Sequence, residues 1–371
     1  MSRSIVLEQT IHAFYQTGIF LLDGMHNVWS GLGGADDLGY FFYGTSIAVI
    51  TGLAPYQAGN LFFYGSVVVS FLLLLLSLFV AFPSFYAVVI VALGLIRLWM
   101  PLQELNHPYV AYLLAVSVIP VILLIQRKQT TYMSMGVCFV SGSILGIADT
   151  VRIHAALPVF VFALFYFLGA HFLTMRTKLI ALSVLVCGYA IPRLHFLYEV
   201  HKRDTFLIEH GYPVPHTQSH LFWHNIYAGF GFVQNDYGIE WTDTCAAQAA
   251  LQENVDAHYA KPLYEETVRA LIFKLCREKR YFVMITLFAK IGVVIYYFLL
   301  YFGWLGLLVA YYYPKPWYIE GAFVCAMGVS ALPGILTLPV TAYLIGFISC
   351  TIIYTLYSVL WAYASYKKKS V

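Results

Sequence analysis

Two adjacent carboxylates, Asp36 and Asp37, stand immediately before a long stretch without charge. Residues 38–96 contain no Asp, Glu, Lys or Arg. Carboxylates are costly to place beside hydrocarbon, so a pair at this position favours a chemical role over packing. A positioned carboxylate acts as a general base toward a hydroxyl or an amine. The alternative is a structural acid, either solvated or capping a helix that begins near Leu38.

Three histidines recur at intervals of four residues in the longest polar stretch of the chain. On a helix, His216, His220 and His224 share one face, which is the arrangement of a zinc site. Hydrogen bonding to a sugar or a phosphate is the second interpretation, with Trp223 and His224 beneath a sugar ring. Packing is the third. No metal site is assigned from this spacing, although a divalent cation is compatible with it.

Further acids are candidates for substrate binding or catalysis. Asp236 and Asp243 lie among aromatic residues in the same polar stretch, and a loop-structural role is their alternative. Glu104, which precedes Asn106-His107-Pro108-Tyr109, lies between two apolar runs and is expected to line the same cavity.

The composition indicates that these residues are carried by an integral membrane protein. Hydrophobic residues make up 61% of the 371 residues and charged residues 11%, against about 25% charged in a soluble domain. The mean hydropathy is +0.75. We expect one all-α membrane domain over residues 1–371, with about 9–10 spans of roughly 20 apolar residues. The predicted spans are 60–82, 84–100, 106–125, 133–149, 157–173, 178–198, 291–313, 317–333 and 340–361.

The N-terminal segment 5–22 is a weaker prediction, because it contains Glu8 and His12. It is either a poor first span or an amphipathic helix at the membrane interface.

Charge predicts the orientation of the spans. The connections 126–128, 175–178 and 314–316 and the tail 366–369 are basic and contain no acid, which places them on the cytoplasmic side. All acidic residues except Glu320, and all histidines except His171, then fall on the other side or in the N-terminal segment. We therefore expect the chemistry on the non-cytoplasmic face, with a cytoplasmic C-terminus.

Two external segments are expected to carry the residues that perform the chemistry. The first is a loop over 23–59 with the acidic pair, and the second is a large loop over 199–290. Residues 245–280 have a helical pattern, and 281–290 are expected to continue as an interfacial helix before the span at 291. Cys245 and Cys276 share this loop, where a disulfide is one possibility and separate thiols the other.

Several motifs, taken in order, resemble the GT-C superfamily of polytopic glycosyltransferases, which includes protein mannosyltransferases and aminoarabinose transferases. The acidic pair and Tyr40-Phe41-Phe42-Tyr43-Gly44, followed by Thr51-Gly52-Leu53-Ala54-Pro55-Tyr56, are similar to the first external loop of these enzymes. The later matches are the segments 146–154, 220–231, 237–243 and 333–339. The resemblance covers most of the chain by order and topology, except that these enzymes place a clear span before the acidic loop.

The resemblance implies a transfer of sugar from a polyprenyl-phosphate donor to an acceptor on the non-cytoplasmic face of a bacterial inner membrane. Asp36 or Asp37 is then the catalytic base. Arg152, Arg193 and Lys290 are the candidates for the donor phosphate, with snorkelling toward lipid headgroups as their alternative. The implied substrate-binding residues are Glu104, His154, His220, Trp223, His224 and Asp243.

Other functions remain as alternatives. A polysaccharide polymerase or ligase would depend on Arg193, Arg203, His220 and His224 of the large loop. A transporter or flippase would need charges and broken helices within the spans, which are nearly charge-free. The sequence contains no phosphate-binding P-loop, GxSxG or HExxH motif, and no basic run typical of nucleic-acid binding.

Overall fold

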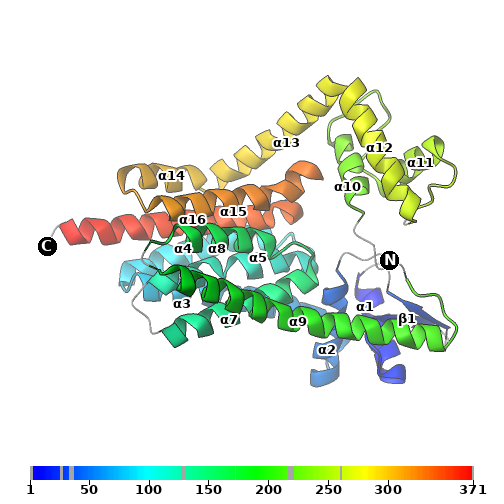
Figure 1. Cartoon of the computed structure of the whole chain (residues 1–371), viewed down its shortest axis with the longest axis horizontal. Coiled ribbons are helices and arrows are strands. Elements are labelled where there is room, and N and C mark those ends of the chain that lie inside the picture. The colour runs from blue at the N-terminus through cyan, green and yellow to red at the C-terminus, as the bar shows by residue number, and fades with distance from the viewer. Residues whose placement is uncertain are drawn as a thin grey trace.

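A computed structural model describes residues 3–25, 28–32, 37–126, 131–171, 173–215, 221–259 and 261–369. These form a bundle of helices and one antiparallel hairpin (Figure 1). The α-helices are α1 (Arg3–Thr17), α2 (Leu38–Thr51), α3 (Pro55–Ala81), α4 (Phe85–Leu102), α5 (Val110–Val116), α6 (Ile119–Leu123), α7 (Thr131–Val151), α8 (Leu157–Gly169), α9 (Met175–Glu209), α10 (Phe222–Gly229), α11 (Asp243–Glu253), α12 (Pro262–Glu278), α13 (Arg280–Leu300), α14 (Gly303–Tyr312), α15 (Trp317–Leu336) and α16 (Thr341–Lys369). The remaining elements are strands β1 (Leu22–Met25) and β2 (Val28–Gly31) and the short 3-10 helices η1 (His107–Tyr109), η2 (Leu124–Gln126) and η3 (Phe230–Phe232).

Seven of these helices are long and apolar enough to cross a bilayer: α3, α4, α7, α9, α13, α15 and α16. They indicate a membrane protein and confirm the prediction of a mainly α-helical one. Two other predicted spans correspond to shorter apolar segments, one over 107–123 and one formed by α8.

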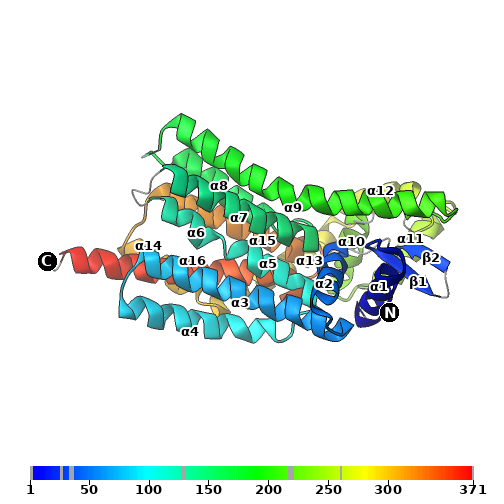
Figure 2. The same ribbon diagram turned by 90° about the horizontal axis from the view of Figure 1, so that it is seen from below.

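The bundle has two ends that differ in what they carry. We call the end with α1, α2, the hairpin and α10–α12 the loop end, and the end with the C-terminus the tail end (right and left in Figure 1). The basic connections 174–178 and 313–316 lie at the tail end (Figure 2). The placement of the two ends on opposite sides of a membrane stays a prediction.

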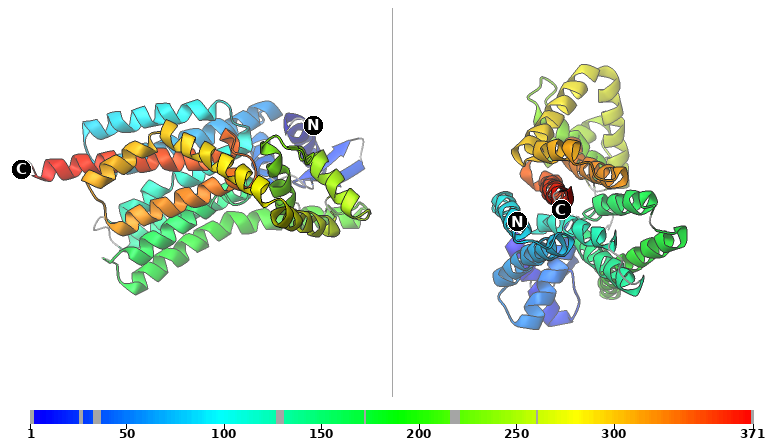
Figure 3. Two further views of the ribbon diagram at one scale, coloured as in Figure 1. Left: turned by 90° about the horizontal axis from the view of Figure 1, so that it is seen from above. Right: turned by 90° about the vertical axis from the view of Figure 1, so that its left-hand side faces the viewer.

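Close helix packing depends on small residues. A Cβ added to Gly142 of α7 would lie 2.0 Å from the Leu185 carbonyl oxygen of α9, and one added to Gly188 would lie 2.2 Å from the Phe139 carbonyl oxygen. Without a hydrophobic driving force between helices in lipid, such backbone contact is a main source of helix association. Helix α16 lies among the other helices in the end-on view (Figure 3) and is mostly buried.

Three boundaries differ from the sequence prediction. Helix α9 continues to Glu209, so the first part of the expected 199–290 loop is helical. Helix α13 begins at Arg280 and runs unbroken to Leu300, which replaces the interfacial helix predicted before residue 291. The apolar run 291–313 is divided, because Phe302 adopts a left-handed φ of 64° between α13 and α14.

The expected first external loop is also partly regular. It contains the hairpin, which pairs Leu22 with Gly31, and all of α2. Helix α1 has 15 residues, fewer than the roughly 20 of a typical span, and it is not among the seven helices long and apolar enough to cross a bilayer.

Helices α10, α11 and α12 pack around their own apolar cluster, which includes Leu221, Phe230, Tyr264 and Val268. Residues 245–280 are thus helical as predicted, with an interruption after Glu253. Cys245 and Cys276 are free thiols, so the disulfide alternative is wrong.

Candidate active site

A cavity of about 240 Å³ lies at the loop end, where the helix bundle meets α10. Its wall combines the end of α7, the start of α8, one face of α10 and the end of α15. The lining residues are Tyr112, Arg152, Ile153, His154, Leu157, Pro158, Phe222, Asn225, Ile226, Val329, Ser330, Leu332, Pro333, Leu336, Thr337 and Tyr343. Most of these side chains are apolar, and Arg152 brings a permanent positive charge to the wall.

Arg152 directly follows the last turn of α7, and its backbone N–H donates to the Ala148 carbonyl at 2.9 Å. The residue is buried. Its Nη2 donates to the Tyr109 hydroxyl at 3.2 Å, and its guanidinium carbon lies 4.6 Å from the centre of the Tyr109 ring. A π face stabilises a cation without neutralising it, so the guanidinium is positioned and keeps its charge.

Lys290 is the second cation of this region. It projects from the middle of α13, is 1% exposed, and its Nζ donates to the carbonyl oxygen of Thr337 at 2.7 Å. Because Thr337 lines the cavity, Lys290 lies directly behind the cavity wall. Among the described residues no carboxylate forms an ion pair with it, and the nearest aromatic ring is Phe230, at 5.8 Å.

Asp37 does not line the cavity. Its side chain is 6% exposed and accepts from Nε of Arg3 at 2.6 Å. It occupies the N-cap position of α2 without making a side-chain cap hydrogen bond, so the capping interpretation holds for its position alone. The other member of the pair, Asp36, lies outside the described residues.

The start of α2 is held against the end of α7. A Cβ on Gly39 would lie 2.2 Å from the Thr150 carbonyl oxygen, two residues before Arg152. The Tyr40 hydroxyl lies 3.1 Å from Nδ1 of His107. Tyr109, in the same 3-10 helix as His107, accepts the hydrogen bond from Arg152. The helix η1 therefore links the acidic segment to the arginine of the cavity.

The structure separates Arg193 from the other two predicted phosphate ligands. Its Nη1 donates to the carbonyl oxygen of Asp149 at 3.4 Å and lies 4.0 Å from Oδ2 of the same residue. Asp149 also accepts from the Tyr189 hydroxyl at 2.7 Å. Arg193 is thus paired within the interface of α7 and α9 and does not line the cavity, so its role toward a phosphate stays a prediction without support from this cavity.

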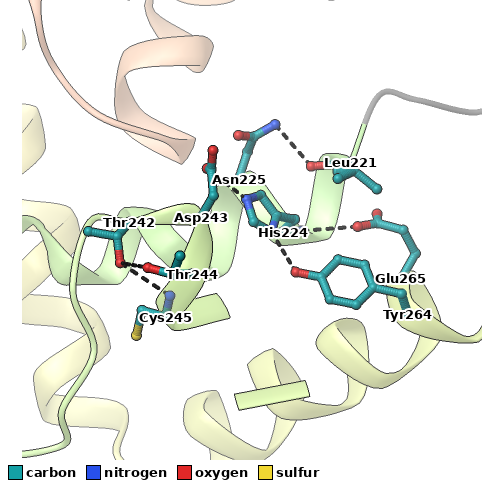
Figure 4. Close-up of polar contacts among 9 residues, drawn as sticks. All are labelled: Leu221, His224, Asn225, Thr242, Asp243, Thr244, Cys245, Tyr264 and Glu265. Atoms are coloured by element: carbon teal, nitrogen blue, oxygen red, sulfur yellow. Dashed lines mark hydrogen bonds and ion pairs between the residues drawn. The ribbon is translucent and has the colours of Figure 1, made fainter. Parts of the chain in front are cut away.

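Figure 4 shows the polar contacts of His224, which the sequence assigned to substrate binding. The ring is buried, with Nε2 at 3.0 Å from Oδ1 of Asp243 and Nδ1 at 2.6 Å from the Tyr264 hydroxyl. A carboxylate only accepts, so in the neutral ring Nε2 donates to Asp243 and Nδ1 accepts from Tyr264. Burial raises the pKa of Tyr264, which keeps its hydroxyl protonated. His224 is therefore held in place by Asp243 and Tyr264, and its contact with a sugar stays a prediction.

Asp243 is the exposed end of this chain of hydrogen bonds, with a side chain that is 82% exposed. It lies near the rim of the cavity, because the nearby Trp241 packs its ring 6.4 Å from that of Tyr343 in the cavity wall. Its assignment to substrate binding thus remains open to test.

The other predicted contacts divide into those at the cavity and those away from it. His154 is exposed, has a φ of 70° and lines the cavity. Glu104 is exposed and does not line it. Trp223 donates its backbone N–H to Glu265 at 2.9 Å and packs against Phe273 at 6.0 Å, so it belongs to the α10–α12 core rather than to a sugar platform.

His216 and His220 lie outside the described residues, so the zinc interpretation of the three histidines stays a prediction. The described residues contain no group of three metal-binding side chains. Of the four residues named for the ligase alternative, Arg203 has a side chain that is 0% exposed and is held by Asp204 and the carbonyl oxygen of Leu32.

Sequence reasoning missed several residues of the wall. Tyr109 positions Arg152, and Tyr112 lines the cavity beside it. The other polar residues of the wall that were missed are Asn225, Thr337 and Tyr343. Thr337 and Tyr343 fall in or beside the motif at 333–339, which was the available signal for that part of the wall.

Comparisons of the chain with protein-family models, with curated proteins and with solved structures found no match.

Proposed function

We propose that the protein is a membrane glycosyltransferase that takes a sugar from a polyprenyl-phosphate donor and transfers it at the loop end of the bundle. The observation that supports this most is the pairing of an apolar cavity with two buried cations, Arg152 in its wall and Lys290 behind Thr337. The GT-C resemblance agrees with this function, and both cations were expected to hold the donor phosphate.

The chemistry of the cavity fits an amphiphilic anion. The leucines and prolines from α8 and α15 favour a hydrocarbon chain, because they have no polar group to offer a ligand. Arg152 favours a phosphate, for which a guanidinium offers two parallel N–H donors. A buried ammonium without a carboxylate partner is costly in a low-dielectric region. A phosphate close to Thr337 would supply the missing negative charge for Lys290.

The proposed transfer needs one base and one leaving group. The acceptor hydroxyl or amine attacks the anomeric carbon of the sugar while a carboxylate takes its proton. The bond from the anomeric carbon to the phosphate oxygen breaks, and polyprenyl phosphate leaves with the electron pair. Arg152 and Lys290 stabilise its growing negative charge. Asp36 or Asp37 is the proposed base, and the ion pair of Asp37 with Arg3 favours Asp36.

Sidedness is part of the proposal. The basic connections at the tail end agree with a cytoplasmic tail end. The cavity would then open on the periplasmic side of a bacterial inner membrane.

The test uses purified protein in proteoliposomes with a panel of radiolabelled polyprenyl-phosphate sugars. We expect consumption of at least one donor, and about a 100-fold or greater loss for Arg152→Gln, as for removal of one charge-stabilising donor. Arg280→Gln, which removes an exposed cation at the start of α13, is the matched control and should keep full activity.

Two results would count against the proposal. If no donor of the panel is bound or consumed by the wild-type protein, the function is wrong. If transfer occurs but Asp36→Asn, Asp37→Asn and the double variant all keep full activity, the donor site stands and the base assignment fails.

A further inference from the structure

A second crevice, of about 230 Å³, lies on another side of the bundle, between α4, the α13–α14 junction and α16. Its wall is apolar apart from Arg97, Tyr301 and Thr355. It shares no residue with the cavity that contains Arg152. Leu93 of its wall is 62% exposed on the apolar surface of the bundle, so the crevice faces the region that lipid chains occupy.

Arg97 stands within a span rather than at its end. Five residues separate it from Leu102 at the end of α4, which is about 7.5 Å along the helix axis at 1.5 Å per residue. An arginine at this depth is costly and marks a functional site by default. Its long side chain can also reach toward the headgroups, so its contacts decide between the two readings.

Those contacts fix the guanidinium inside the crevice. Nη2 donates to the carbonyl oxygen of Leu300 at 3.0 Å, and Nη1 lies 3.2 Å from Sδ of Met100. The guanidinium carbon lies 4.9 Å from the ring centre of Tyr301 and 5.7 Å from that of Phe302. The side chain is therefore directed at the break between α13 and α14.

The helix break explains part of this arrangement. Leu300 is the last residue of α13, and a cation at a helix C-terminus is favourable. Thr355 similarly donates its hydroxyl to the carbonyl oxygen of Phe302 at 3.0 Å. The Phe302 carbonyl also accepts from the backbone N–H groups of Leu305 and Gly306, so Arg97 is needed only at Leu300. A carbonyl dipole does not neutralise a full charge.

One N–H group of Arg97 and its positive charge have no partner among the described residues. Its Nε is buried and makes no hydrogen bond to a described residue. No carboxylate of the described chain forms an ion pair with it, in contrast to Arg3 and Arg203. The crevice thus combines an apolar, lipid-facing wall with one positive charge that has no carboxylate partner among the described residues.

We propose that this crevice binds one anionic phospholipid of the surrounding bilayer. A phosphate oxygen accepts from the accessible edge of the Arg97 guanidinium, and an acyl chain lies along Leu93, Leu305 and Leu356. Charge complementarity selects a phosphate with net negative charge over a zwitterionic headgroup. The bound lipid would complete the α13–α14 junction, where the chain itself leaves the charge unbalanced.

The test measures binding of phosphatidylglycerol and phosphatidylcholine to the delipidated full-length protein by native mass spectrometry. We expect one phosphatidylglycerol to bind at least about 10-fold more tightly than phosphatidylcholine, consistent with one charge-assisted hydrogen bond. Arg97→Gln should abolish this preference, Arg97→Lys should keep part of it, and Arg280→Gln should leave it unchanged. Equal binding of both lipids, or an unchanged preference in Arg97→Gln, would overturn the proposal.

A second measurement covers a failure of Arg97→Gln to fold. Photoreactive phosphatidylglycerol bound to the wild-type protein should label peptides that contain Leu93 or Leu305. Labelling confined to other peptides contradicts the site. Displacement of phosphatidylglycerol by an equimolar amount of polyprenyl phosphate would also overturn the assignment, because it would identify the crevice as a donor-lipid site.

Discussion

Two lysines, Lys315 at the tail end and Lys290 near the loop end, are almost equally buried but differ in their partners. The side chain of Lys315 is 0% exposed, and its Nζ lies 2.6 Å from Oε1 of Glu320 and donates to Ser358 at 2.8 Å. Lys290 has the Thr337 carbonyl oxygen and no carboxylate among the described residues. One lysine closes an ion pair within the chain, and the other leaves a charge for a ligand.

The comparison shows that burial of a cation does not by itself mark a site. Burial lowers the pKa of Lys315, and the nearby Glu320 carboxylate opposes that shift. Such a pair holds α14, α15 and α16 together at the tail end and offers nothing to a substrate. The absence of a described counterion at Lys290, next to a cavity, is what distinguishes a candidate binding site from a structural ion pair.

The largest expected effect on ligand binding is at Lys290, where binding and stability should change independently. Lys290→Met should reduce polyprenyl-phosphate binding by about 100-fold or more, as expected for the loss of a charge-stabilising group. Replacement of an uncompensated buried cation by an apolar side chain should leave stability unchanged or higher. Binding is measured by titration in nanodiscs and stability by thermal unfolding in micelles. A destabilised variant with normal binding would reverse the comparison.

The opposite result is expected at Lys315. Lys315→Met should destabilise the protein by about 3–5 kcal/mol, because it leaves the carboxylate of Glu320 without its partner. The double variant Lys315→Met with Glu320→Gln should recover most of this loss. Polyprenyl-phosphate binding by the folded fraction should not change. An additive loss in the double variant would show that the two residues do not stabilise each other.

A smaller effect is expected for Tyr264→Phe. This variant tests whether the hydrogen bonds that hold α10 in place also affect binding in the cavity. Tyr264→Phe leaves Nδ1 of buried His224 without its hydroxyl partner, at a cost of about 1–3 kcal/mol. The face of α10 that lines the cavity carries Asn225 and Ile226, so binding should change little. Thermal unfolding and the same titration check both statements. A loss of binding larger than the loss of stability would assign His224 to the site itself.

The sequence predicted the features that depend on local composition. Apolar runs of about 20 residues mark spans because the bilayer core requires that length, and this identified α3, α15 and α16. It also predicted a continuous span over 291–313. There the break at Phe302 is stabilised by Arg97 and Thr355, which are remote in sequence.

The candidate site was predicted only in part, for the same reason. Arg152 and Lys290 were among the external cations named for the donor phosphate that the resemblance implies. Tyr109, whose ring contacts Arg152, precedes it by 43 residues in the sequence. Thr337, whose carbonyl oxygen accepts from Lys290, follows that lysine by 47 residues. Arg193 had the same local pattern, but Asp149 pairs with it. Only tertiary contacts show which cation lines the cavity and which is held in a helix interface.

The central claim is that the cavity with Arg152 and Lys290 holds a lipid-linked phosphate. The most direct test is a structure of the protein in a nanodisc with bound polyprenyl phosphate. The account predicts the phosphate within hydrogen-bond distance of Arg152 and the isoprenoid chain between α8 and α15. A phosphate bound elsewhere while this cavity stays free of lipid would contradict it.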